Sequence, residues 1–253
     1  MSKVTDRYDQ QNIINLARQQ YETDRRKKLP SIIVPLVSAG KVYPQSNPMR
    51  QGTVEMRHMT AYDEDILTNT TYIKSGVVFD KLLESIILTP IAIKDICDVD
   101  KLGLILNARI SAYGSEYNVI VKDPETGNSL NRTIDLNSIQ SKPYNKEADE
   151  NGEFEYKIND SYTLKYKLYG ISTTDTTSII GYLKSIITQV NSTRNKSDID
   201  EFIQYDFLAN DSRIFRKHVV DNTPELDLMI DFEGENGSTF QAGFPFGPDL
   251  FWF

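Results

Sequence analysis

Cysteine is almost absent from this chain of 253 residues, and its scarcity excludes two kinds of structure. The single cysteine, Cys97, cannot form an intrachain disulfide, and one thiol cannot build a zinc site of cysteine ligands. Cys97 lies in a stretch rich in isoleucine, with Ile91, Ile93 and Ile96 close by. We therefore expect a buried and unreactive thiol.

Basic charge and long apolar runs are also scarce. The chain carries 28 Lys and Arg against 36 Asp and Glu, which gives a formal net charge of −8. Nucleic-acid binding needs clustered basic side chains on the phosphates, and the one basic run, Arg25 to Lys28, is typical of a solvated segment end. No stretch approaches the roughly 18–20 apolar residues of a membrane span, and no signal peptide opens the chain. We expect an intracellular protein with neither nucleic acid nor membrane as partner.

Catalytic motifs are missing from the sequence. It contains no phosphate loop, dinucleotide glycine motif, nucleophile elbow or paired-histidine metal helix. The two histidines, His58 and His218, stand 160 residues apart without a serine or cysteine motif beside either. The sequence therefore predicts no catalytic residue, no cofactor and no metal site.

The remaining composition is that of an ordinary globular protein, with 39% hydrophobic and 25% charged residues. The length allows one large domain or two small ones. We expect an N-terminal helical arm over residues 1–30 and a single α+β domain over 31–253. That domain is either undivided or consists of two lobes. The first lobe would be mainly helical over 31–115, and the second would consist of hairpins plus helices over 116–253.

The N-terminal arm has a narrow apolar stripe. Ile13, Leu16 and Ala17 recur on one face of a helix predicted over residues 5–28, and Pro30 supplies its stop. Such a narrow stripe indicates either a helix that needs a partner or a frayed arm. Ile13 and Leu16 are candidate partner-docking residues.

Periodicity and turn signals predict the other elements. Short strands are expected at 32–34 and 53–58, and hairpins at 117–134, 153–168 and 226–242. Helices are expected after Thr60, at about 76–88 and 99–113, and in three segments over 179–190, 197–207 and 211–219. Helices and antiparallel hairpins are segregated rather than alternating, so we predict an α+β fold without a parallel doubly wound sheet.

The helix expected over 99–113 is apolar almost all round, which predicts a buried helix. Asp98 is its expected cap. Arg109 lies on this helix, and a buried guanidinium needs a carboxylate partner.

The C-terminus is aromatic. Gly243, Pro245, Gly247 and Pro248 prevent a regular helix there. The tail either closes the protein's own core or docks on a partner. Its candidate partner-docking residues are Phe244, Phe246, Phe251, Trp252 and Phe253.

Three stretches together resemble a known family. They are Lys101–Ile110 followed by Tyr113–Tyr117, the helix start Asp211–Arg216, and the ending with Pro248, Phe251 and Trp252. In order and spacing they resemble the base plate protein family of T-even-type contractile-tail bacteriophages, which includes baseplate hub proteins. The resemblance spans about residues 53–253 and leaves the N-terminal arm uncovered.

Many members of that family carry two Cys-x-x-Cys-Gly turns that look like zinc knuckles. In this chain the first turn is Asp123–Gly127, with Asp and Thr at the thiol positions, and the second is Glu233–Ser238. Structural zinc at such turns is bound by thiolates. The resemblance therefore implies a metal-free chain whose hairpins are held by Pro-Gly and Asn-Gly turns.

The resemblance implies a tail baseplate hub protein that acts in baseplate and tail assembly through protein–protein contacts, as a hub component or as an assembly chaperone, and not as an enzyme. Its partners would be other baseplate, hub or tail proteins. It would work in the host cytoplasm during assembly or in the tail baseplate of the virion. The alternative is a hydrolase whose carboxylate pair leaves no sequence signature. The oligomeric state is left open.

Overall fold

The computed structural model describes residues 28–171 and 178–252. The predicted N-terminal helix, with Ile13 and Leu16, therefore lies outside the described residues except for its last position, and Phe253 lies outside them as well. Within the described ranges, helices accompany two- and three-stranded sheets whose strands all pair antiparallel. The predicted α+β class is confirmed.

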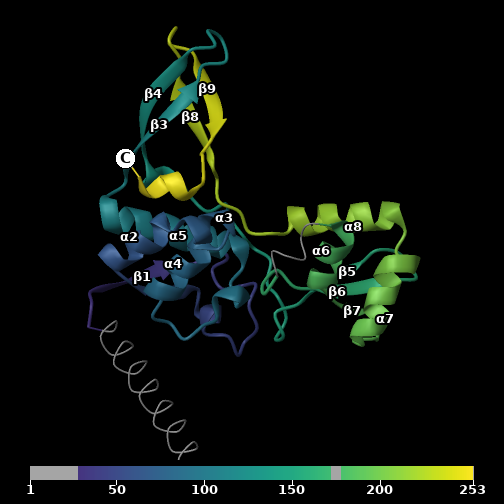
Figure 1. Ribbon diagram of the computed structural model, residues 1–253. Coiled ribbons are helices and arrows are strands. Elements are labelled where there is room, and N and C mark those ends of the chain that lie inside the picture. The colour runs from purple at the N-terminus through teal and green to yellow at the C-terminus, as the bar shows by residue number, and fades with distance from the viewer. Residues whose placement is uncertain (1–27, 172–177, 253) are drawn as a thin grey trace, which may run out of the picture.

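The first part of the described chain forms a helical body (Figure 1). Its elements are β1 (Ser31–Pro35), β2 (Thr53–Arg57), α2 (Ala61–Thr68), α3 (Thr70–Lys74), α4 (Val78–Ile86) and α5 (Asp98–Tyr113). β1 pairs antiparallel with β2, and Ile87 bridges to Met56 on the other side of β2. The two predicted strands and the helix near 76–88 are confirmed. The short α3, which the side chain of Asn69 caps, was not predicted.

The residues that begin α2 and α5 explain where these two helices start. The side chain of Thr60 and that of Asp63 form a capping box at the start of α2. The prediction that Asp98 caps α5 is wrong by one residue, because the extended residue at that start is Cys97. Asp98 instead occupies the first turn, where the helix dipole favours a carboxylate.

Two hairpins form a projection above the helical body, here called the finger (Figure 1). It consists of β3 (Glu116–Lys122), β4 (Ser129–Asp135), β8 (Met229–Glu233) and β9 (Thr239–Gly243). Each hairpin pairs within itself in antiparallel register. Buried side chains alternate along β3 and β4, as the period of a strand requires. Both hairpin predictions are confirmed.

A third group of elements, the side unit, lies beside the helical body (Figure 1). It contains β5 (Phe154–Lys157), β6 (Thr163–Tyr166), α6 (Ile179–Ile186), β7 (Ile187–Val190), α7 (Lys196–Glu201), a π-helix (Phe202–Asp206) and α8 (Ala209–Asp221). The predicted helix over 179–190 is confirmed as far as Ile186, and the prediction is wrong beyond that residue. Residues Ile187–Val190 pair with β6 instead, because that strand has an edge that they can hydrogen-bond.

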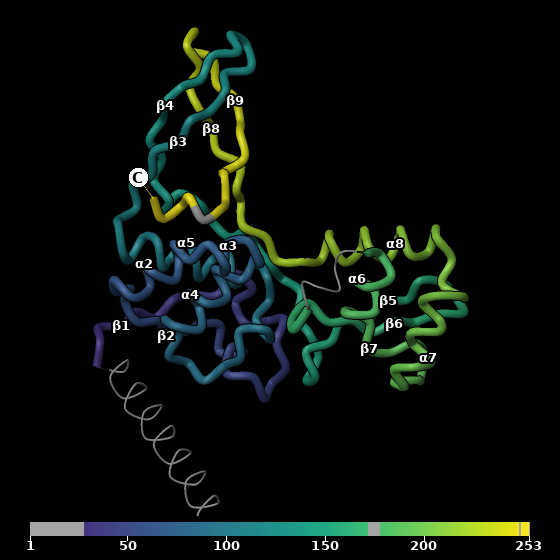
Figure 2. The backbone as a smooth tube through the Cα atoms, in the orientation of Figure 1, coloured from purple at the N-terminus to yellow at the C-terminus, as the bar shows by residue number. Residues whose placement is uncertain are grey.

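Two connections join the finger to the side unit, one after β4 and one before β8 (Figure 2). They lie side by side, since Ser141 and Leu226 form an antiparallel bridge and the amide of Lys142 donates to the carbonyl of Glu225 over 2.9 Å. Buried apolar side chains from all three parts belong to one contiguous core. The proposed division into lobes at residues 115/116 stays a prediction.

Candidate functional site

The aromatic tail lies over the helical body. A short 3-10 helix, Pro248–Phe251, contacts α5 (Figure 1). Phe251 is 1% exposed and Phe244 is 6% exposed, so both belong to the chain's own core. Phe246 is half-buried, and Trp252 remains 37% exposed. Among the described docking candidates, Trp252 therefore offers the largest exposed fraction to a partner.

Ring contacts hold the tail in place. Phe251 lies 6.3 Å from Phe79 and 6.4 Å from Tyr113, measured between ring centroids. The ring of Phe246 meets the edge of Phe79 at 5.9 Å. Such edge-to-face and tilted pairs add to the burial of apolar area. These contacts support the tail on α4 and α5, and the docking role of the tail residues stays a prediction.

Arg109 connects the tail to the helical body. The side chain is 2% exposed and donates from Nε to the carbonyl of Leu250 over 2.8 Å and from Nη1 to the carbonyl of Gly114 over 2.7 Å. Its Nη2 donates to the carbonyl of Glu116 over 3.3 Å. A carboxylate partner was expected, yet these three acceptors are backbone carbonyls. The guanidinium thereby joins α5, the start of β3 and the tail.

The tips of the two finger hairpins meet at Asp123. Its Oδ1 accepts from the amides of Glu125 (2.8 Å) and Thr126 (3.3 Å) in its own turn, and its Oδ2 accepts from the amide of Glu235 (2.9 Å) in the other hairpin. A Cβ added at Gly234 would lie 3.0 Å from that same Oδ2, so this close approach favours glycine. The backbone hydrogen bonds, the one from Glu235 first, lower the pKa of Asp123 below its ordinary value.

Further contacts join the same two hairpins. The guanidinium of Arg132 donates twice to the carbonyl of Glu233, over 3.1 and 2.6 Å. The side-chain amide of Asn128 donates from Nδ2 to Glu235 Oε2 over 2.9 Å. The sequence predicted a turn in each of these hairpins, but it did not predict that the two turns are in contact.

These turns do not fit a structural zinc ion. Both oxygens of Asp123 already accept backbone N–H groups, and the hydroxyl of Thr126 accepts from the amide of Asn128. Nowhere in residues 28–171 and 178–252 do three or more His, Cys, Asp or Glu side chains gather so that they could hold a metal. The donor set here is one carboxylate and main-chain amides, where a knuckle presents thiolates.

The helical body also contains a buried carboxylate, Asp100, within a network of hydrogen bonds. Asp100 is fully buried and accepts from Ser38 N (2.8 Å), Ser38 Oγ (2.7 Å) and Tyr43 Oη (2.6 Å). Burial raises the pKa of Asp100 and, together with the neighbouring charge of Asp100, that of Tyr43. Asp100 ties the loop after β1 to α5.

The histidines are also engaged in structure. The ring of His218 stacks on Tyr156 with 3.8 Å between centroids, and its Nε2 lies 3.2 Å from the hydroxyl of Tyr166. Burial lowers the pKa of His218. The Nδ1 of His58 lies 2.7 Å from Ser111 Oγ. The sequence did not predict the contact between His58 and Ser111, which lie 53 residues apart. That neither histidine is a catalytic base stays a prediction.

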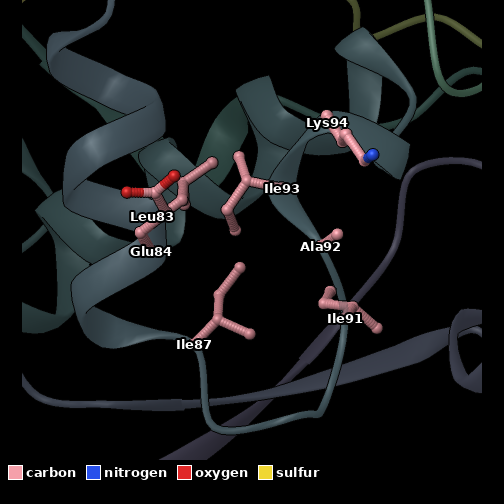
Figure 3. Close-up of a pocket in the computed structure, with 7 residues that line it drawn as sticks. All are labelled: Leu83, Glu84, Ile87, Ile91, Ala92, Ile93 and Lys94. Atoms are coloured by element: carbon pink, nitrogen blue, oxygen red, sulfur yellow. The ribbon is translucent and has the colours of Figure 1, made fainter. Parts of the chain in front are cut away.

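A pocket opens between the end of α4 and the loop that precedes α5 (Figure 3). Its volume is about 330 Å³, and its lining consists of Leu83, Glu84, Ile87, Ile91, Ala92, Ile93 and Lys94. Glu84 is the one carboxylate among these lining residues, and it pairs with Lys81 at 2.7 Å. The pocket therefore presents no pair of carboxylates for hydrolysis.

Large apolar side chains also stand on the surface. Ile120 on β3 of the finger is 74% exposed, and Ile33 on β1 is 75% exposed. In the side unit, Tyr205 and Leu208 lie close together in sequence where the π-helix gives way to α8, and both are exposed. Exposed apolar side chains are ordinary when scattered, and they supply contact area when a partner covers them.

These features define an α+β protein with apolar side chains at several places on its surface. Comparison with known families matches residues 34–239 to the T4 bacteriophage base plate protein family. The match covers most of the chain, so the chain belongs to this family and is a phage baseplate component. No curated protein and no solved structure gives a significant match. Among the described helices, none has the length and apolarity needed to cross a membrane.

Proposed function

We propose that this protein acts at the hub of the phage baseplate, where it promotes baseplate and tail assembly through protein–protein contacts and catalyses no reaction. The observation that carries the proposal is the family match over residues 34–239. The partners are other baseplate, hub or tail proteins. The protein meets them in the host cytoplasm during assembly or in the virion tail.

Two surfaces are proposed for these contacts. The first is the aromatic tail, where Trp252 is exposed beside the buried Phe251 and Phe244. The second is the stripe with Ile13 and Leu16, which lies outside the described residues. Aromatic anchors beside a supporting apolar core are the usual centres of protein interfaces.

The proposal includes two versions, a permanent hub component and an assembly chaperone that leaves. We favour the chaperone. A permanent subunit needs a large apolar interface, whereas the exposed apolar side chains of this chain are divided among the finger, the helical body and the side unit. Small separate contacts suit a protein that holds its partners for a limited time.

The test is a co-purification from infected cells. The tagged chain, its Trp252→Ala variant and a matched Tyr62→Ala variant are compared, because both substitutions remove an exposed aromatic ring and spare the core. Point variants are preferable to deletion of the tail, since Leu250 and Phe251 are buried.

We expect baseplate or hub proteins with the unmodified chain and with Tyr62→Ala, and a strong loss of them with Trp252→Ala. Recovery of the chain alone in every sample would contradict the proposed function. Undiminished recovery with Trp252→Ala would remove the tail from the proposed interface. Presence of the chain in purified virions would contradict the chaperone version.

A further inference from the structure

The pocket at the end of α4 is apolar at its centre. Leu83 and Ile93 are buried, and Ile87 and Ile91 are half-buried beside them. In Figure 3 the side chains of Ile87 and Ile93 point into the space, while the charged end of Lys94 lies at its margin. A volume of about 330 Å³ is at the lower end of the range for ligand pockets, roughly 300–1,000 Å³. It can take in one or two aliphatic side chains.

The pocket lies close to the point where the N-terminal segment joins the fold. Ile32 of β1 is opposite Met56 of β2, and Met56 is opposite Ile87 of the pocket. Neighbouring strands lie about 4.8 Å apart, which places Ile87 roughly 10 Å from Ile32 across the sheet.

The N-terminal segment is long enough to reach this place. Leu16 precedes Ile32 by 16 residues. That length spans about 24 Å as a helix and about 50 Å when extended. Pro30, directly before β1, favours a change of direction there. Both lengths exceed the roughly 10 Å from Ile32 to the pocket, so a segment that turns back near Pro30 reaches it.

The net charges of the N-terminal segment and of the rest of the chain favour contact between them. Residues 1–27 carry six basic and four acidic side chains, whereas the whole chain carries 28 basic and 36 acidic ones. The N-terminal segment is thus positive and the rest of the chain is strongly negative. Opposite net charges attract a tethered segment to the surface of the body that it is attached to.

We propose that the pocket formed by α4 and residues 91–94 binds the apolar stripe of this chain's own N-terminal segment, with Leu16 as the inserted side chain and Ile13 beside it. The contact is intramolecular. A short tether gives an effective concentration in the millimolar range, so burial of two aliphatic side chains is enough to populate it.

This contact has a consequence for partners. The same stripe is one of the surfaces proposed to bind a baseplate protein, so a partner that takes Leu16 must release it from the pocket and expose Ile87 and Ile91. The inference concerns the isolated chain and stands or falls independently of the proposed function.

Hydrogen exchange of the full-length chain tests the proposal. The measured peptide covers residues 87–94, and the compared proteins are the unmodified chain, Leu16→Asp and Asn15→Asp. Both substitutions add one negative charge to the segment, but residue 15 falls on the opposite side of the predicted helix. We expect about tenfold faster exchange in Leu16→Asp, because one buried aliphatic side chain changes an equilibrium by at least that factor. Asn15→Asp leaves the exchange unchanged.

A variant of the pocket provides the reciprocal measurement. Ala92 is exposed at the wall of the pocket, so Ala92→Trp fills the space without disturbing the core. We expect faster exchange at residues 10–22 in this variant. Equal exchange at residues 87–94 in all three proteins would overturn the proposal. Protection that disappears on dilution would overturn it as well, since the occupant would then be the segment of a second copy.

Discussion

The Oδ2 of Asp123 lies 2.9 Å from the backbone nitrogen of Glu235, although 112 residues separate the two in the chain. This hydrogen bond joins the turns of two hairpins that do not share a sheet. The same carboxylate closes its own turn through Glu125 and Thr126. The side chain of Asp123 therefore contacts both tips of the finger, beside the contacts that Arg132 and Asn128 make between the same hairpins.

Loss of this carboxylate should loosen the finger. In Asp123→Ala the amides of Glu125 and Glu235 lose their acceptor, and a donor left unpaired destabilises the folded state. We expect faster hydrogen exchange in β3, β4, β8 and β9 and a lower melting temperature. Asp135→Ala is the control, because Asp135 caps a local turn through Asn137. An equal effect of both substitutions on the β8–β9 hairpin would show that Asp123 does not link the hairpins.

The stability of the finger should depend on pH through the carboxylate of Asp123. Backbone hydrogen bonds lower the pKa of folded Asp123 below 3.8, so its contribution to stability is complete above the pKa of the unfolded chain. It is lost as the pH falls through the folded-state pKa. Between the unmodified chain and Asp123→Asn, the difference in unfolding free energy should therefore shrink below about pH 4. Denaturant titrations at several pH values measure this, and a difference that grows with acid would contradict it.

Zinc chelation should leave the finger unchanged. The two turns present a carboxylate, a hydroxyl and amides in place of thiolates, so we expect the melting temperature to be the same with and without a strong chelator. Elemental analysis of the purified chain should find no stoichiometric zinc. One zinc per chain, together with a lower melting temperature after chelation, would contradict the prediction.

A buried ion pair lies within the helical body. Arg57 donates to both oxygens of Asp63 over 2.7 and 2.9 Å, and Ser85 Oγ donates to Asp63 Oδ1 over 2.7 Å. Both partners of the pair are buried. Asp63→Ala leaves a buried guanidinium without its carboxylate, which costs about 3–5 kcal/mol of unfolding free energy.

Asp221→Ala is the control for the buried pair. It breaks the exposed pair with Lys217 on α8, which is worth roughly 0.3–0.5 kcal/mol. Urea titrations of both variants compare the two losses. Similar losses in the two variants would contradict the expected cost of leaving the buried guanidinium of Arg57 without its carboxylate.

The hairpins illustrate what could be predicted locally. Gly127 has φ of 74° and Gly237 has φ of 77°, a region where glycine pays no steric cost. Turn residues between alternating apolar residues therefore indicated three hairpins correctly. The capping box of Thr60 and Asp63 marked the start of α2 in the same way.

Residues Ile187–Val190 show where local reasoning fails. Ile187 and Val190 continue the helical spacing of Leu183 and Ile186, and all four side chains are buried. The pattern therefore fits one helix. The chain forms a strand there because β6 offers an open edge for hydrogen bonding, and the sequence pattern contains no information on that edge.

The sequence by itself determined the fold class, the hairpin turns and most helices, because these depend on residues close together in the chain. It also carried the family resemblance, which depends on the order and spacing of several stretches along the chain and on no contact between them. The tertiary structure decided the contacts between distant residues: Asp123 with Glu235, Arg109 with Leu250, and Asp100 with Tyr43. It also decided that Phe251 is buried while Trp252 is exposed. Such pairings arise when packed elements bring polar groups together in a buried place, where each must find a partner.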